Sequence, residues 1–158
     1  QLPYRLVDIS GASGTVTGFT IALSNVAGTV AGVSFARLRR HLQPLQIVTL
    51  VYGLMAIGYL LIGLAQHTPM VLAGLALAGF GLGLTVPNLS TWLSSFTPPA
   101  MRGRVMGGLT AAVFIGQFVS PLVAQPFVNA YGTAGPFLAA SVLLAVLGGV
   151  AWGLRNKA

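Results

Sequence analysis

Three amide side chains lie inside long apolar stretches of the chain, where a polar group is expensive. They are Asn25, Asn88 and Gln117. A polar side chain within a bilayer faces the protein interior or a water-filled path, so each amide needs a partner there. That partner is either another helix, through a hydrogen bond worth about 1 kcal/mol, or a solute that the helices enclose. Both interpretations stay open at this point.

Proline accompanies two of these amides and favours the second interpretation. Pro87, which precedes Asn88, leaves the carbonyl of Gly83 without its helical partner. Pro121 does the same to the carbonyl of Gln117. A freed carbonyl beside an amide makes a polar notch in mid-membrane, and solute sites are built at such interrupted helices. Prolines in membrane helices also often only kink them.

Thr91 and Trp92 follow Asn88 by about one turn and join it as candidate residues of a solute cavity. Trp92 has a second interpretation, because it lies near one end of its apolar stretch, where tryptophans gather at the membrane surface. Two roles for Trp92 therefore stay open, stacking on a substrate and anchoring at the interface.

The chain offers no set of residues that would support catalysis, a metal or a cofactor. It has no cysteine, and its two histidines, His41 and His67, fall at opposite membrane faces in the topology described below. Intramembrane hydrolysis needs a serine with a histidine or lysine, paired aspartates, or histidines at one depth. The glycines at positions 79, 81 and 83 are not a nucleotide fingerprint, because no strand precedes them. We expect no enzyme activity.

The composition requires elements that cross a bilayer. Hydrophobic residues make up 55% of the chain and charged residues 6%, whereas a soluble domain carries about a quarter charged residues. From His41 to Met101 the chain has no Lys, Arg, Asp or Glu over 61 residues. Because one helical crossing takes about 20 residues, two crossings fit in this stretch.

The same reasoning predicts an all-α fold, a polytopic bundle of five transmembrane helices. The helices are expected over about residues 14–36, 45–65, 70–96, 105–128 and 136–154, with residues 1–13 as an outer loop. Open β-structure is excluded because every backbone group in a bilayer needs an internal partner, and the spans are too long for barrel strands. Glycine pairs four residues apart, at 14/18, 28/32, 79/83, 103/107 and 149/153, predict close helix packing.

The basic residues gather on one face of this bundle. By the positive-inside rule that face is cytoplasmic, and so is the C-terminus. Because the charges are confined to short loops and one terminus, nucleic acid is not an expected partner. Seven of the eight Lys and Arg residues lie on this face: Arg37, Arg39, Arg40, Arg102, Arg104, Arg155 and Lys157.

Two roles stay open for these arginines, and above all for Arg37, Arg40, Arg102 and Arg104. They act as topology signals and contacts for anionic lipid, or as gating contacts with helix ends. Arg102 and Arg104 are the better gating candidates, since glycines at positions 103 and 107 allow close approach.

The order of residues resembles the C-terminal half of a major facilitator superfamily (MFS) transporter that lacks its first helix. Three stretches carry the resemblance: residues 32–40, the glycine run 79–83 leading to Pro87 and Asn88, and residues 98–104 followed by Gly107 and a proline-bearing helix. The five helices then resemble helices 8 to 12 of that fold. Within residues 32–40, Ala36 stands where the family's loop signature often has an aspartate.

Polar content differs between the expected helices. Residues 45–65 and 137–154 carry few polar side chains, so these two helices are expected to face lipid. The resemblance implies the same, since helices 9 and 12 of the family are peripheral while helices 8, 10 and 11 border the cavity.

These observations predict secondary active transport of a small solute, such as efflux of a drug or metabolite, by alternating access. The expected partners are membrane lipids, a small-molecule substrate and a missing N-terminal half of the same transporter. The expected location is a membrane, the bacterial inner (plasma) membrane. No charged residue lies inside a span, so either the groups that couple transport to an ion lie in the missing half or the protein is a uniporter. The alternative is a membrane scaffold or assembly subunit that transports nothing.

Overall fold

The computed structural model describes residues 2–11 and 13–155. These residues form helices and short turns with no strand among them, which confirms the predicted all-α fold. The elements are α1 (Leu2–Ser10), α2 (Gly14–His41), α3 (Pro44–Leu64), α4 (Thr68–Phe96), the 3₁₀ turn η1 (Pro99–Met101), α5 (Arg102–Tyr131), the 3₁₀ turn η2 (Gly132–Ala134) and α6 (Gly135–Arg155).

The long helices begin and end where local chemistry requires it. The Ser13 side chain accepts a hydrogen bond from the Val16 N–H at the start of α2. Gln43 and Gln46 form a capping box at the start of α3, where Pro44 occupies the first turn. Between α5 and α6 the chain reverses at Gly132, whose φ of 67° lies in the left-handed region that favours glycine.

Two helices extend further than expected and include basic residues. Helix α2 runs to His41 and includes Arg37 and Arg40. Its last turn carries Arg39, Arg40 and His41, and cations there are favoured by the helix macrodipole. Helix α5 begins at Arg102, so Arg102 and Arg104 lie in its first turn. These arginines therefore sit on helices and not in loops.

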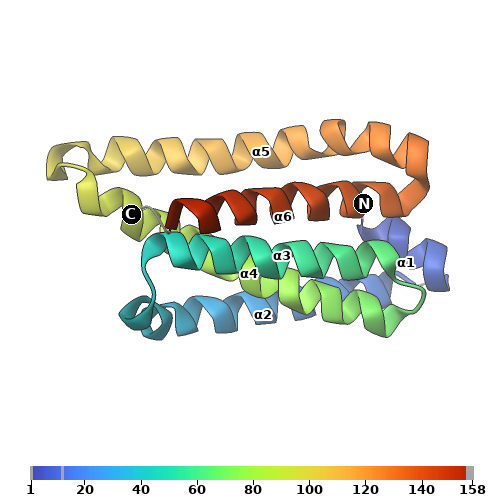
Figure 1. Ribbon diagram of the computed structural model, residues 1–158. Coiled ribbons are helices and arrows are strands. Elements are labelled where there is room, and N and C mark those ends of the chain that lie inside the picture. The colour runs from blue at the N-terminus through green and yellow to red at the C-terminus, as the bar shows by residue number, and fades with distance from the viewer. Residues whose placement is uncertain (1, 12, 156–158) are drawn as a thin grey trace.

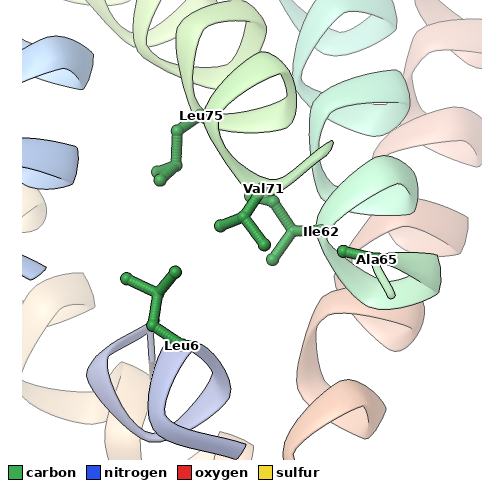
Figure 2. Packing of buried hydrophobic residues seen from close by; sticks show 5 residues of the cluster. All are labelled: Leu6, Ile62, Ala65, Val71 and Leu75. Carbon is green, nitrogen blue, oxygen red and sulfur yellow. The ribbon is translucent and has the colours of Figure 1, made fainter. Parts of the chain in front are cut away.

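The expectation that residues 1–13 form an outer loop is wrong for most of that segment, because α1 covers Leu2–Ser10. A helix of nine residues is unstable alone, so packing must hold it. Leu6 is fully buried in one apolar cluster with Ile62, Ala65, Val71 and Leu75. Figure 2 shows the Leu6 side chain of α1 pointing toward the side chains from α4.

The long helices run side by side, so the bundle has two separate ends (Figure 1). The end of α2, the start of α5 and the end of α6 lie at one end, which we call the basic end after Arg37, Arg39, Arg40, Arg102 and Arg104. Helix α1, the α3–α4 turn and η2 lie at the other, which we call the opposite end.

Four stretches of the described residues are long and apolar enough to span a membrane. The last of them reverses at η2 and contains both α5 and α6. The stretches are Gly14–His41, Pro44–Leu64, Thr68–Phe96 and Pro99–Leu154.

Helix α4 packs against α2 and α3 through glycine. A Cβ placed on Gly74 would lie 2.6 Å from the carbonyl oxygen of Gly58 on α3, and a Cβ on Gly83 would collide with the backbone of Gly28 on α2. The predicted close packing is confirmed for the pairs 28/32 and 79/83. Around the pairs 14/18, 103/107 and 149/153 a Cβ would meet nothing within the described residues, so those pairs make no such contact here.

Helices α3 and α5 differ from the expectation based on polar content. Six residues of the apolar helix α3 are buried, because it lies between α4 and α6. Helix α5, with its amides, buries none of its residues and lies along the outside of the described bundle (Figure 1). The apolar composition of α3 therefore serves packing on two sides as well as contact with lipid.

Candidate functional site

A groove of about 540 Å³ lies between α4 and α5 and is the one that brings predicted site residues together. We call it the α4–α5 groove. Gln117 and Pro121 line it, one helical turn apart, and Thr85 lines it from α4. The full lining is Leu82, Thr85, Val86, Val113, Gly116, Gln117, Ser120 and Pro121.

The polar groups of the α4–α5 groove differ in how free they are. The Thr85 hydroxyl donates to the carbonyl of Gly81 in its own helix at 3.0 Å. The Gln117 side chain is exposed and makes no hydrogen bond within the part of the chain that the structure describes. Pro121 cannot donate to the carbonyl of Gln117, so that carbonyl lacks its helical partner. Gln117 therefore offers the groove an amide that has no partner among the described residues.

Asn88 lies elsewhere, in the contact between α3 and α4. It is 1% exposed, and its Nδ2 donates to the carbonyl of Pro44 at 3.1 Å. Its Oδ1 is buried with no partner among the described residues. These contacts fit the interpretation in which Asn88 forms a hydrogen bond between helices. Asn88 does not line the α4–α5 groove.

The remaining cavity candidates are not brought together with Gln117. Asn25 is exposed on α2, and Trp92 is half-buried near the end of α4. The Thr91 hydroxyl donates to the carbonyl of Pro87 in its own helix at 2.7 Å. None of these residues lines the α4–α5 groove.

A second groove, of about 640 Å³, lies where α3, α5 and α6 meet near α1. The rings of Tyr59 and Phe137 lie at its wall with their centroids 6.2 Å apart, and Leu2 reaches it from α1. Its lining includes Tyr59 and Ser120 among apolar residues, and none of the residues predicted to form a solute cavity lies on it. Sequence reasoning missed it because the groove exists only once α6 has folded back beside α5.

Sequence reasoning also missed a polar cluster at the opposite end. Arg5 Nη2 donates to the carbonyls of Gly63 and Ala65 at 2.9 Å each, at the C-terminal end of α3. Asp8 accepts from the Thr133 hydroxyl at 2.6 Å and lies 3.6 Å from Arg5 Nη1. We call Arg5, Asp8 and Thr133 the Arg5 cluster. It joins α1, α3 and η2, and the three-residue spacing of Arg5 and Asp8 was its signal in the sequence.

The arginines of the basic end have far fewer partners. Arg102 Nε donates to the carbonyl of Thr97 at 3.3 Å. Arg39 Nε is buried without a partner among the described residues. Arg37, Arg40 and Arg104 are exposed and make no side-chain hydrogen bond or ion pair within residues 2–11 and 13–155.

Comparison with known proteins places these features in a family context. The family model described as Major Facilitator Superfamily matches residues 2–158. The chain is similar to Major facilitator superfamily domain-containing protein 10 of Mus musculus, with 32% identity over 111 residues, which are 70% of this chain and 24% of that protein.

Two further relatives have names that describe transport. Multidrug efflux pump Tap of Mycolicibacterium fortuitum is 23% identical over 137 residues, 87% of this chain and 34% of Tap. Sugar transport protein 5 of Arabidopsis thaliana is 34% identical over 123 residues, 75% of this chain and 22% of that protein. The chain thus spans about a quarter to a third of the length of these relatives. No solved structure matches it.

Proposed function

The chain belongs to the Major Facilitator Superfamily, and from this premise we propose that it is part of a secondary transporter that moves a small solute by alternating access. In this proposal the chain supplies helices 8 to 12 of the C-terminal half. Membrane transport and the absence of enzyme activity agree with the names of the relatives, which include an efflux pump and a sugar transport protein.

The α4–α5 groove is the observation that carries this proposal. It presents one free amide, at Gln117, and the hydroxyls of Thr85 and Ser120 among apolar walls. Such a lining fits an amphipathic solute, whose apolar part contacts the walls and whose few polar groups bind the amide. These residues offer few partners for the many hydroxyls of a sugar, so we propose a drug-like compound or apolar metabolite as the cargo.

The exposed polar face of α5 supports a partner outside this chain. Gln125 donates to Asn129 at 3.1 Å on an exposed part of the helix, and Gln117 is exposed as well. Amides are too costly to face lipid, so this side of α5 is expected to meet protein or a water-filled path. The proposed partner is the N-terminal half of the same transporter, which also holds any group that couples transport to an ion.

The basic end sets the proposed orientation. Arginine-rich ends of membrane helices remain in the cytoplasm. We therefore propose that the basic end and the C-terminus lie on the cytoplasmic side and the Arg5 cluster on the outer side, in a bacterial inner membrane.

Transport by the full-length protein in proteoliposomes tests the proposal. We expect Gln117→Leu to lower the transport rate of an amphipathic substrate by about tenfold or more, because it removes the free amide and leaves the solute's polar group unpaired. The matched control is Phe118→Leu on the next residue of α5, which is 79% exposed and outside the groove. Unchanged kinetics in Gln117→Leu would contradict the groove assignment. A well-folded wild-type protein that moves none of a broad substrate panel would contradict transport and favour a scaffold.

A further inference from the structure

A third groove lies at the basic end, between α2, α3 and α4, with a volume of about 260 Å³. We call it the basic-end groove. We propose that it binds one anionic phospholipid, with the headgroup phosphate at Arg37 and His41 and an acyl chain along the apolar floor. Its lining is Ser34, Arg37, Leu38, His41, Leu50, Phe80 and Leu84.

The groove itself is almost wholly apolar, and three residues of α2 that carry hydrogen-bond donors border it. We call these three residues the rim. Ser34, Arg37 and His41 follow one another at spacings of three and four residues, which places them on one face of the helix. The guanidinium of Arg37 can bind two phosphate oxygens at once, and the hydroxyl of Ser34 and the imidazole of His41 add single donors. The rim therefore suits a phosphate group.

No carboxylate among the described residues lies at this rim. Asp8 is the single acid of the sequence, and it lies at the opposite end bound to Thr133 beside Arg5. Arg37 is exposed and makes no side-chain hydrogen bond or ion pair with the described residues. The described residues therefore supply no counter-charge for Arg37.

The floor of the groove distinguishes a lipid from other anions. Leu50 is exposed and lies about 9 Å along α3 from its start at Pro44, inside an uncharged span. An acyl chain fills an apolar floor at this depth, whereas free phosphate or a carboxylate from another protein segment uses only the rim. Basic pockets between helices at the cytoplasmic surface commonly hold anionic headgroups, in keeping with this assignment.

Native mass spectrometry of the purified full-length protein tests the site without measuring transport. Dioleoyl phosphatidylglycerol and dioleoyl phosphatidylcholine are added at equal concentration, and the retained lipid is counted. We expect the wild type to retain phosphatidylglycerol about fivefold better, and Arg37→Gln to remove most of that preference, since one basic residue contributes about fivefold to binding of an anionic lipid. Arg37→Lys keeps the charge and should retain part of the preference.

Two further variants separate the rim from the floor. Arg104→Gln removes the same charge at the same end but outside the groove, so the preference should persist. Phe80→Ala enlarges the floor and should weaken retention of both lipids equally, with melting temperature as the check on folding.

Several results would overturn the assignment. Equal retention of both lipids by the wild type, or equal losses in Arg37→Gln and Arg104→Gln, would show general charge attraction only. Displacement of the lipid by millimolar inorganic phosphate would indicate a free-anion site. Retention that is insensitive to Arg37→Gln would show that Arg37 does not bind the headgroup.

Discussion

The two ends of the bundle use arginine in opposite ways. At the opposite end, Arg5 has a side chain only 13% exposed, and its donors reach backbone carbonyls of α3 and the Thr133 hydroxyl. At the basic end, Arg37, Arg40 and Arg104 are exposed without a partner among the described residues. Arg5 works as a structural group within the chain, whereas Arg37, Arg40 and Arg104 are left to interact with groups beyond the described residues.

The difference follows from where acceptors are available. The last carbonyls of a helix have no partner in the helix itself, and Arg5 lies where those of α3 end. The basic-end arginines of α2 and α5 lie on helix termini without a carboxylate, since the one acid of the chain belongs to the Arg5 cluster. An arginine's role here depends on the acceptors that the fold brings near it.

Among the substitutions that test this difference between the ends, Arg5→Ala should have the largest effect on stability. We expect the free energy of unfolding to fall by about 2 to 3 kcal/mol, because two charged hydrogen bonds of 2.9 Å are lost and α1 is released from α3. Unfolding of the full-length protein in increasing SDS measures the loss. Arg5→Lys should recover part of it, and Tyr4→Ala, at a side chain that is 70% exposed, should change little. A loss no larger for Arg5→Ala than for Tyr4→Ala would remove the structural role.

Asn88→Leu tests whether the basic end is held by neutral contacts. We expect a loss of about 1 kcal/mol in unfolding free energy, because the bond from Asn88 to the Pro44 carbonyl ties α4 to the start of α3. The transport KM should not change, since Asn88 is outside the α4–α5 groove. Asn25→Leu makes the same substitution at an exposed amide and should cost less. If Asn88→Leu abolished transport but left stability unchanged, Asn88 would instead be assigned to the solute cavity.

The smallest effect is expected for Arg104→Gln. Its side chain is exposed and unpaired in the described residues, so unfolding free energy should stay within about 0.5 kcal/mol of the wild type. The same SDS titration measures it beside Arg5→Ala. A loss as large as that of Arg5→Ala would reveal a partner for Arg104 elsewhere in the transporter and erase the contrast between the ends.

Helix α1 shows why part of the fold escaped prediction. Its charges and short length suggested a loop, although Leu2, Leu6 and Ile9 repeat with helical spacing. These residues pack into the cluster of Ile62, Ala65, Val71 and Leu75, which assembles only when α3 and α4 are in place (Figure 2). A short helix that depends on distant partners leaves a weak local signal.

The candidate site, too, was only partly predictable from the sequence. Asn88 and Gln117 are both amides near a proline within an apolar helix, and the sequence treats them alike. The structure turns Asn88 into the α3–α4 contact and Gln117 into the α4–α5 groove. Rotation of a helix about its axis is set by packing with its neighbours, which single-sequence reasoning does not resolve.

The amino-acid sequence by itself determined the all-helical membrane fold, since a bilayer forces long uncharged stretches into helices and confines charge to their ends. It also determined the basic residues that distinguish one end from the other. Only the tertiary structure decided which amide lacks a hydrogen-bond partner, which arginine binds backbone carbonyls of the chain, and where the grooves between helices lie. Those properties depend on contacts between residues far apart in the chain, as between Arg5 and Gly63 or Asn88 and Pro44.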